Sequence, residues 1–265
     1  MSRREGAHEN VVFGINPVLE QLRARPEGAE QLYLAEGMVP KAQAAEILSR
    51  ARDAGLKVQK LPRERLHALA GGGVHQGVVL EVKEFEYLEL PDLIDAARAD
   101  EGGRPPLIVL LDGIQDPQNF GAILRSAHAL GAHGVVIPKD RAVGVTGAVL
   151  KASAGAAAHT PVARVTNLSR ALEELKEAGF WIAAADPEGN QALHEAKLVG
   201  ALALVVGAEG PGVRKGVLEH CDFRLRIPMS GEVASLNASV SAALLLYEVQ
   251  RQRLSPAKVP AKGQK

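Results

Sequence analysis

Three segments of the chain carry the polar side chains best suited to chemistry. The first, Leu110 to Gly131, contains Asn119 and Arg125 in the pattern N-x-x-x-x-x-R, together with further Asp, Asn and Gln residues. Asp and Asn commonly cap the start of a helix, and an arginine on a helix is often solvated or salt-bridged. Each of these residues therefore has a structural explanation if it is taken alone.

The second segment, Leu204 to Gly216, places glycines on both sides of Glu209. Glycines let the backbone adopt a positive φ or approach a ligand closely, but they also build ordinary strand-to-helix turns. Their spacing matches neither the dinucleotide pattern G-x-G-x-x-G nor a P-loop. A nucleotide-dependent dehydrogenase is therefore only the second choice for a chain of this kind.

The third segment, Arg226 to Glu248, places Ser235 and Asn237 before a long helical pattern. We expect one of these two residues to be the N-cap of that helix. The helix then begins with small residues, which allow another helix, another subunit or a ligand to approach closely: Ala238, Ser239, Ser241 and Ala242.

Zinc and serine-hydrolase chemistry find little support in the sequence. The eight histidines lack the spacing of metal ligands, and the single cysteine, Cys221, has no partner for a metal site or a disulfide. A G-x-S-x-G nucleophile elbow is also absent from the sequence. We therefore predict no metal site and a structural role for Cys221.

The hydrophobic pattern indicates how the three segments are positioned. Apolar runs at 107–111, 135–137, 180–184, 201–206 and 223–227 alternate with helical patterns at 119–130, 147–156, 167–178, 213–220 and 236–252. Such alternation predicts an α/β fold with a mostly parallel, buried sheet and helices on both faces. In sheets of this kind ligands bind beyond the carboxyl ends of the strands. The polar residues of all three segments come directly after predicted strands, at these carboxyl ends.

A change in composition predicts two domains. Residues 87–106 are rich in acidic residues, Gly and Pro, and we expect a linker there, with an amphipathic turn around 93–97. Residues 11–86 are expected to form a small α/β domain and residues 107–255 the larger domain. We expect flexible ends at 1–10 and at 256–265, where the tail is basic.

Composition and charge exclude several classes of protein. With 46% hydrophobic residues in 265, the chain can bury substantial cores, and no stretch without charged residues is long enough to cross a membrane. The start of the chain lacks an apolar export signal, so we expect a cytoplasmic protein without a membrane partner. The 31 basic and 31 acidic side chains balance, and bulk charge alone predicts no nucleic-acid partner.

Together and in this order, the three segments resemble the three motifs of the SpoU, or TrmH, branch of the SPOUT methyltransferases. The matching elements are Asn119 with Arg125, G-A-E-G at 207–210, I-P-M at 227–229 and S-L-N at 235–237. The stretches at 11–22 and 73–82 resemble the amino-terminal RNA-binding domain, similar to ribosomal protein L30e, of the 23S rRNA guanosine 2′-O-methyltransferase subfamily. The resemblance covers nearly the whole chain.

The resemblance implies transfer of a methyl group from S-adenosyl-L-methionine to a ribose 2′-hydroxyl of RNA, with a guanosine of 23S rRNA as the first choice. It further implies a homodimer and a deep trefoil knot in the carboxyl-terminal domain. The residues that it assigns to the methyl donor are Gly207, Gly210, Ile227, Met229 and Leu236. The residues that it assigns to the reaction centre are Asn119, Arg125, Glu209, Ser235 and Asn237.

The resemblance leaves the role of Arg125 open between a general base and an RNA-binding group. A guanidinium stays protonated up to a pH of about 12, and the protonated group has no acceptor atom. We therefore prefer a role in which the planar, forked guanidinium of Arg125 binds the phosphate and ribose of the target. Local basic charge for RNA is expected from Arg214, Lys215, Arg224 and Arg226. The alternatives are 2′-O-methylation of tRNA and a non-catalytic RNA-binding or ribosome-assembly protein.

Overall fold

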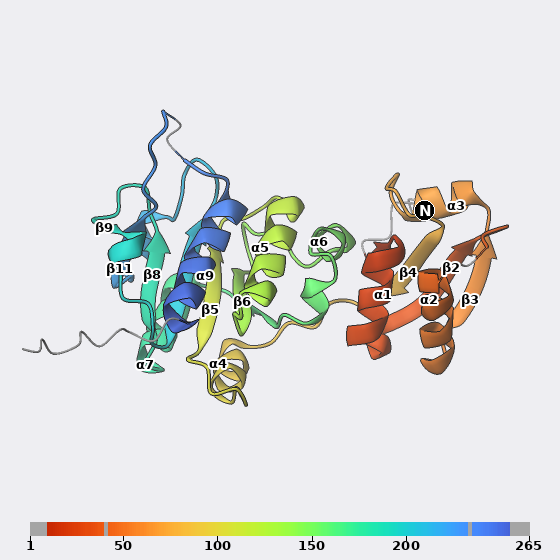
Figure 1. The fold of residues 1–265 in the computed structure, drawn as a ribbon, viewed down its shortest axis with the longest axis horizontal. Coiled ribbons are helices and arrows are strands. Elements are labelled where there is room, and N and C mark those ends of the chain that lie inside the picture. Colours follow the sequence, from red (N-terminus) through yellow and green to blue (C-terminus); the bar gives the residue numbers. More distant parts are fainter. Residues whose placement is uncertain (1–9, 40–41, 233–234, 255–265) are drawn as a thin grey trace, which may run out of the picture. The chain divides into compact units, whose positions relative to one another are not determined.

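The computed structural model of the chain describes residues 10–39, 42–232 and 235–254 and divides into two compact units (Figure 1). The first unit comprises the described parts of Met1–Tyr87, together with Asp116–Arg125 and Val143–Pro161. The second unit comprises Leu88–Gln115, Ser126–Ala142 and the described parts of Val162–Lys265. Of the ends predicted to be flexible, residues 1–9 and 256–265 lie outside the described ranges.

A four-stranded sheet in the order β1-β4-β2-β3 lies at the centre of the first unit. Its strands are β1 (Val11–Phe13), β2 (Ala29–Ala35), β3 (Lys57–Leu61) and β4 (Val78–Val82). Strand β4 runs antiparallel to β1 and β2, and β2 runs parallel to β3. The amino-terminal helices are α1 (Ile15–Ala24), the 3-10 turn Pro26–Gly28, α2 (Ala42–Asp53) and α3 (Arg63–Leu69). The prediction of a small α/β fold in this part of the chain is confirmed.

The second unit is built on a seven-stranded sheet in the order β7-β6-β5-β10-β8-β11-β9. Its strands are β5 (Leu107–Asp112), β6 (Gly134–Pro138), β7 (Val162–Val165), β8 (Trp181–Ala185), β9 (Gln191–Ala192), β10 (Leu202–Gly207) and β11 (Phe223–Arg226). Every neighbouring pair of these strands is parallel. Their carboxyl ends therefore share one edge of the sheet, as the sequence predicts.

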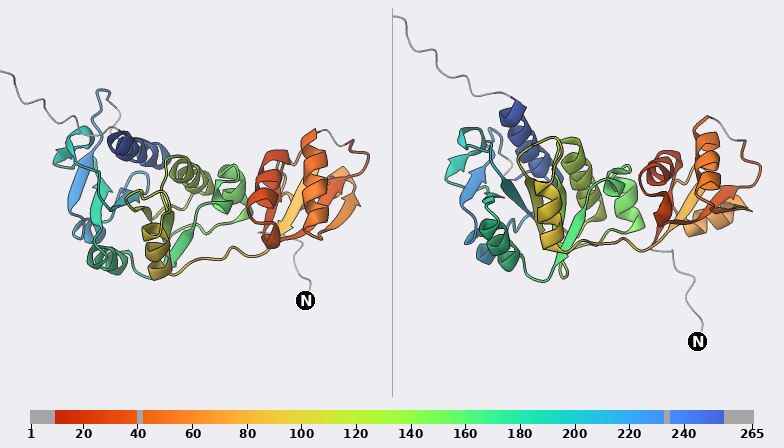
Figure 2. Two further views of the ribbon diagram at one scale, coloured as in Figure 1. Left: turned by 60° about the horizontal axis from the view of Figure 1, so that its bottom comes forward. Right: turned by 90° about the horizontal axis from the view of Figure 1, so that it is seen from below.

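Helices cover both faces of this sheet, which confirms the predicted layers. The remaining helices are α4 (Leu90–Arg98), α5 (Pro117–Ala129), α6 (Gly147–Ala152), α7 (Leu168–Glu177), α8 (Lys215–Leu218) and α9 (Ala238–Leu254), with 3-10 turns at Ala156–Ala158 and Leu193–Glu195. In Figure 2, α4 and α7 lie on one face of the sheet and α9 lies on the other. Helix α5 is divided between the two units, and α6 belongs to the first.

The segment predicted as a linker, 87–106, holds a full helix. Helix α4 buries Leu90, Leu93, Ile94 and Ala97 in the core of the second unit, because their spacing places them on one helical face. The sequence predicts only a turn there, because flanking glycines, prolines and acidic residues obscure the short helical pattern. Sequence reasoning also missed α3 and the short strands β7 and β9, and it expected α8 to be longer than the four residues observed.

Within the described ranges, no helix is both long and apolar enough to cross a membrane.

Candidate active site

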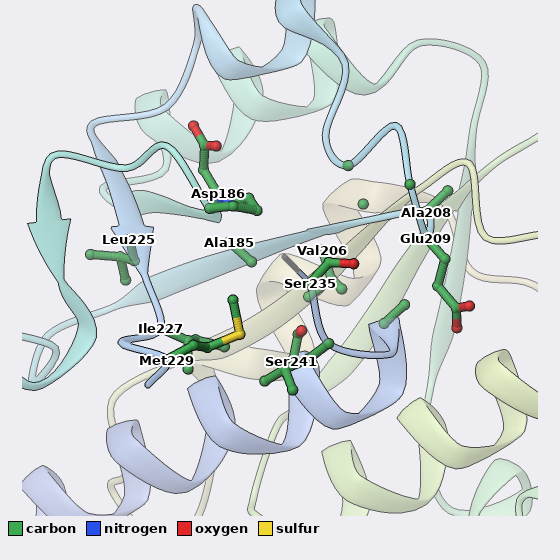
Figure 3. Close-up of a pocket in the computed structure, with 16 residues that line it drawn as sticks. Ala185, Asp186, Val206, Ala208, Glu209, Leu225, Ile227, Met229, Ser235 and Ser241 are labelled. Atoms are coloured by element: carbon green, nitrogen blue, oxygen red, sulfur yellow. The ribbon is translucent and has the colours of Figure 1, made fainter. Parts of the chain in front are cut away.

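A pocket opens at the carboxyl edge of the seven-stranded sheet, entirely within the second unit (Figure 3). It contains about 620 Å³ of space, including its open mouth. The loops that follow β8, β10 and β11 form its walls, and the start of α9 closes one side. The lining residues are Ala185, Asp186, Pro187, Val206–Gly210, Gly212, Leu225, Ile227, Met229, Ser235, Leu236, Ala238 and Ser241.

Seven residues of the predicted site line this pocket, and they come from different loops. The residues predicted to contact the methyl donor all line it: Gly207, Gly210, Ile227, Met229 and Leu236. Glu209 and Ser235 of the predicted reaction centre line it as well. The second and third sequence segments are therefore brought together although they are separated in the chain by α8 and β11.

The loop after β10 is folded tightly back on the end of its own strand. Ala208 and Gly212 form an antiparallel bridge, and the amide of Gly212 donates to the carbonyl of Ala208 at 2.9 Å. A Cβ added at Gly207 would overlap the backbone of Gly212 and Val213, so any larger residue there would force the loop open. Gly210 adopts a φ of 82°, a conformation that favours glycine.

Asn237 joins the third segment to the second. Its side-chain nitrogen donates a short hydrogen bond to a carboxylate oxygen of Glu209. Its oxygen accepts from the amide and hydroxyl of Ser239, at 2.9 and 2.6 Å, and so caps α9. The expectation that Ser235 or Asn237 caps this helix is confirmed for Asn237, which leaves the hydroxyl of Ser235 on the pocket wall.

The first segment forms the start of α5. The carboxylate of Asp116 accepts from the amides of Gln118 and Asn119, at 3.3 and 3.1 Å, which makes Asp116 the cap of the helix. Asn119 is half-buried and Arg125 is exposed. The residues that line the pocket include neither of them.

Carboxylates are the charged groups on the pocket wall, and they come from Asp186 and Glu209. The Asp186 carboxylate accepts from Arg224 at 2.6 Å, and in Figure 3 it points away from Ser235 and Ser241. Among the residues that the structure describes, no Lys or Arg lines the pocket. An apolar pocket with a carboxylate at its edge and no cation in its wall favours a ligand that carries positive charge.

Sequence reasoning missed the loop after β8, which contributes Ala185, Asp186 and Pro187 to the pocket. The signal was present, because a D-P-E-G-N turn follows a predicted strand whose carboxyl end lies at the same edge. It also treated Arg214 and Arg224 as RNA-binding charges. Both are paired with carboxylates of their own unit, Arg214 with Asp112 and Arg224 with Asp186.

Two further expectations concern Cys221 and metals. Burial raises the pKa of the Cys221 thiol to about 12, so it stays protonated and unreactive at neutral pH, in keeping with a structural role. Across the described part of the chain, His, Cys, Asp and Glu side chains form no group that could hold a metal ion.

Comparison with known proteins assigns a family to both parts of the chain. Residues 106–247 match the SpoU rRNA methylase family, and residues 11–88 match a family described as RNA 2′-O ribose methyltransferase substrate binding. The 23S rRNA (guanosine-2′-O-)-methyltransferase RlmB of Coxiella burnetii is 42% identical over 93% of this chain and 97% of its own. YacO of Bacillus subtilis, named for the TrmH family of tRNA/rRNA methyltransferases, is 47% identical over 91% of this chain and 95% of its own.

Solved structures share the fold. The SpoU methyltransferase AviRb from Streptomyces viridochromogenes, determined in complex with AdoMet, matches with a TM-score of 0.76 and 25% identity. The alignment covers 92% of this chain and 90% of AviRb. A structure described as an RNA 2′-O ribose methyltransferase matches with a TM-score of 0.72 and 30% identity, over 92% and 89% of the two chains.

Proposed function

Because the chain belongs to the SpoU rRNA methylase family, we propose that it transfers a methyl group from S-adenosyl-L-methionine to the 2′-hydroxyl of a guanosine in 23S rRNA. The observation that carries the proposal is the pocket at the carboxyl edge, where the second and third motifs meet. The 42% identity to RlmB over nearly all of both chains supports the 23S rRNA guanosine as the target.

The apolar lining and the acidic groups of the pocket suit S-adenosyl-L-methionine. Backbone groups of Gly207 and Gly210 and the apolar side chains of Ile227, Met229 and Leu236 would hold the donor. The carboxylate of Glu209 at the pocket wall complements the positive charge of the donor. Because Gly207 has no Cβ, the loop can fold tightly against the end of β10. When bound, the donor supplies a methyl group on a positively charged sulfur; transfer to the hydroxyl oxygen leaves a neutral thioether and releases the hydroxyl proton.

The polar residues of the motifs would orient the RNA. We assign Arg125 to the phosphate and ribose of the target nucleotide, since its fork of donors suits both groups, and we assign Asn119 to the same side of the reaction. Ser235 would contact the reacting groups from the pocket wall. The hydrogen bond from Asn237 holds the Glu209 carboxylate in place, which supports a positioning role for both residues.

The amino-terminal part of the chain would bind the RNA away from the reaction centre. We propose that residues 11–86 form this substrate-binding domain and that residues 107–255 form the catalytic domain. The match of residues 11–88 to a substrate-binding family supports this division. We further propose that the enzyme acts in the cytoplasm.

Helix α9 supports a homodimer. It exposes Val240, Leu244 and Tyr247, with 45%, 38% and 57% of their surface accessible, and their spacing places them on one side of the helix. An exposed apolar stripe of this kind favours burial against a partner. We also propose the trefoil knot that the family resemblance implies.

Incubation of the protein with labelled S-adenosyl-L-methionine and unmodified 23S rRNA tests the proposal. We expect labelled 2′-O-methylguanosine at one position after digestion of the RNA to nucleosides. Label in tRNA and not in 23S rRNA would favour the tRNA alternative. Tight RNA binding with no label transferred to either RNA would favour a non-catalytic assembly protein.

A further inference from the structure

Asp112 is a fully buried carboxylate directly beside the proposed donor pocket, although it does not line it. It ends β5, and its side chain has no accessible surface. Burial of a carboxylate costs free energy unless the group is paired and hydrogen-bonded, so the hydrogen-bond partners of Asp112 must compensate for its burial. Those partners all belong to the loop that follows β10.

Asp112 fastens both ends of that loop. At the start of the loop, the amide of Ala208 donates to the backbone carbonyl of Asp112 at 3.0 Å. At its end, Arg214 donates two hydrogen bonds to the Asp112 carboxylate, from the backbone amide at 2.8 Å and from Nε at 2.7 Å, and its guanidinium forms an ion pair with the same carboxylate at 2.7 Å. One residue of a neighbouring strand thus closes the loop.

The residues between these two anchors form one wall of the pocket. Ala208, Glu209, Gly210 and Gly212 all line it, and Glu209 receives the hydrogen bond of Asn237 there. The loop is glycine-rich, so without its anchors it would sample many backbone conformations. The hydrogen bond from the Gly212 amide to the Ala208 carbonyl closes residues 208–212 and leaves residues 213 and 214 to the Asp112 anchor.

We propose that Asp112 and Arg214 are positioning residues that hold loop 208–214 in the donor-binding conformation and so set the affinity for S-adenosyl-L-methionine. This inference rests on the proposed function, and it withdraws Arg214 from the RNA-binding patch expected from the sequence. Arg214 forms two hydrogen bonds and an ion pair with Asp112, although about half of its side chain remains accessible.

The chain offers a matched control for this pair within the same unit. Arg104 contacts Asp100 with the same three donors, through its amide at 3.0 Å, Nε at 3.2 Å and a terminal nitrogen at 2.9 Å. That pair lies before the first residue of β5, at the opposite edge of the sheet from the pocket. Arg104→Gln therefore removes a comparable ion pair without touching the loop.

The decisive experiment measures donor binding by calorimetry and steady-state kinetics for the parent protein, Arg214→Gln and Arg104→Gln, at a temperature where circular dichroism shows all three folded. If Arg214→Gln leaves the loop closed in one molecule in ten, the apparent Kd and the KM for S-adenosyl-L-methionine rise about tenfold. We expect kcat at saturating donor and the KM for RNA to stay near those of the parent. Arg104→Gln should match the parent in all of these constants.

Two results would overturn the proposal. An unchanged donor Kd in Arg214→Gln would show that the loop needs no anchor, while a raised KM for RNA with weaker salt dependence would identify Arg214 as a phosphate contact. Failure of the parent protein to bind S-adenosyl-L-methionine would instead refute the proposed function, and this inference with it. The first two results leave the proposed function standing.

Discussion

Arginine side chains have different roles at the amino and carboxyl edges of the seven-stranded sheet. At the amino edge, the guanidinium of Arg253 donates to the carbonyls of Pro105, Pro106 and Gly200, at 2.8, 3.2 and 2.7 Å. At the carboxyl edge, Arg214 binds Asp112, but the loop that it anchors leaves a pocket open. The polar groups of the amino edge thus stabilise the fold by binding backbone carbonyls, whereas those of the carboxyl edge also shape a binding site.

This difference teaches how to separate stability from function in one domain. Substitutions at the amino edge should lower the free energy of unfolding and leave methyl transfer intact at temperatures where the protein is folded. Substitutions at the carboxyl edge should lower binding or turnover by more than their effect on stability explains. The following predictions test that separation, starting with the largest expected effect.

Arg125→Lys should have the largest effect on activity. The substitution keeps the positive charge of the residue but removes the planar fork proposed to hold the phosphate and ribose. Because misplacing the hydroxyl by about 1 Å can cost on the order of 10²-fold in rate, we expect a loss of at least that size in single-turnover methylation at saturating donor. The donor Kd should not change. Near-normal turnover would count against both the fork and the base, and would remove Arg125 from the functional side of the comparison.

Gly207→Ala should reduce donor affinity by about an order of magnitude. The added Cβ would overlap the backbone of Gly212 and Val213, and relieving such overpacking costs about 1–3 kcal/mol, or roughly fivefold to 150-fold in affinity. Titration of the protein with S-adenosyl-L-methionine measures the change. Gly216→Ala serves as the control, because a Cβ there meets no atom within 4 Å. Equal affinities for the two variants would show that the tight loop is irrelevant to the pocket.

The sequence predicted the parts of this site that depend on local pattern. The strands β5, β6 and β10 are buried along their length, so their apolar runs stand out, and the glycines around Glu209 mark the loop after β10. That Glu209 and Asn237 belong to one site was expected only through the family resemblance, and their direct contact was not predicted. Neither residue type nor spacing reveals which loops of a parallel sheet become neighbours.

The remaining features could not be predicted because they depend on the order of strands in space. Asp112 and Arg214 are 102 residues apart, and they meet because β5 and β10 are adjacent in the sheet. The contribution of Asp186 likewise follows from the position of β8 between β10 and β11. Strand β9 has two residues, too few for any periodic pattern.

Arg253→Gln should be the largest destabilising change at the amino edge. Burial lowers the pKa of Arg253 to about 10, so the side chain is still charged at neutral pH and its hydrogen bonds to carbonyls are charge-assisted. Since hydrogen bonds to charged groups contribute about 1.5–3 kcal/mol, we expect a loss of that size in the free energy of unfolding, measured by urea denaturation. A tenfold loss of donor affinity in the folded variant would contradict the separation of the two edges.

His133 should give the smallest effect, a change in how stability depends on pH. Its Nδ1 accepts from the amide of Leu107 at 3.0 Å, and burial, followed by the charges of Arg104 and Arg253, lowers its pKa from 6.5 despite the nearby Asp100. As pH falls below 6.5, the unfolded chain gains a proton that the folded protein resists, so the free energy of unfolding should decrease until the lowered pKa is reached.

His133→Asn sharpens this last prediction. The asparagine oxygen can accept from Leu107 in place of Nδ1, but the side chain does not titrate. Urea denaturation between pH 7.5 and 5 should therefore show a weaker pH dependence in the variant, and the donor Kd at pH 7.5 should equal that of the parent. An unchanged slope would assign the acid sensitivity to other groups. A change in donor affinity would show that the amino edge communicates with the pocket, because the Leu107 amide and the Asp100 carboxylate that His133 contacts lie at the opposite end of the sheet.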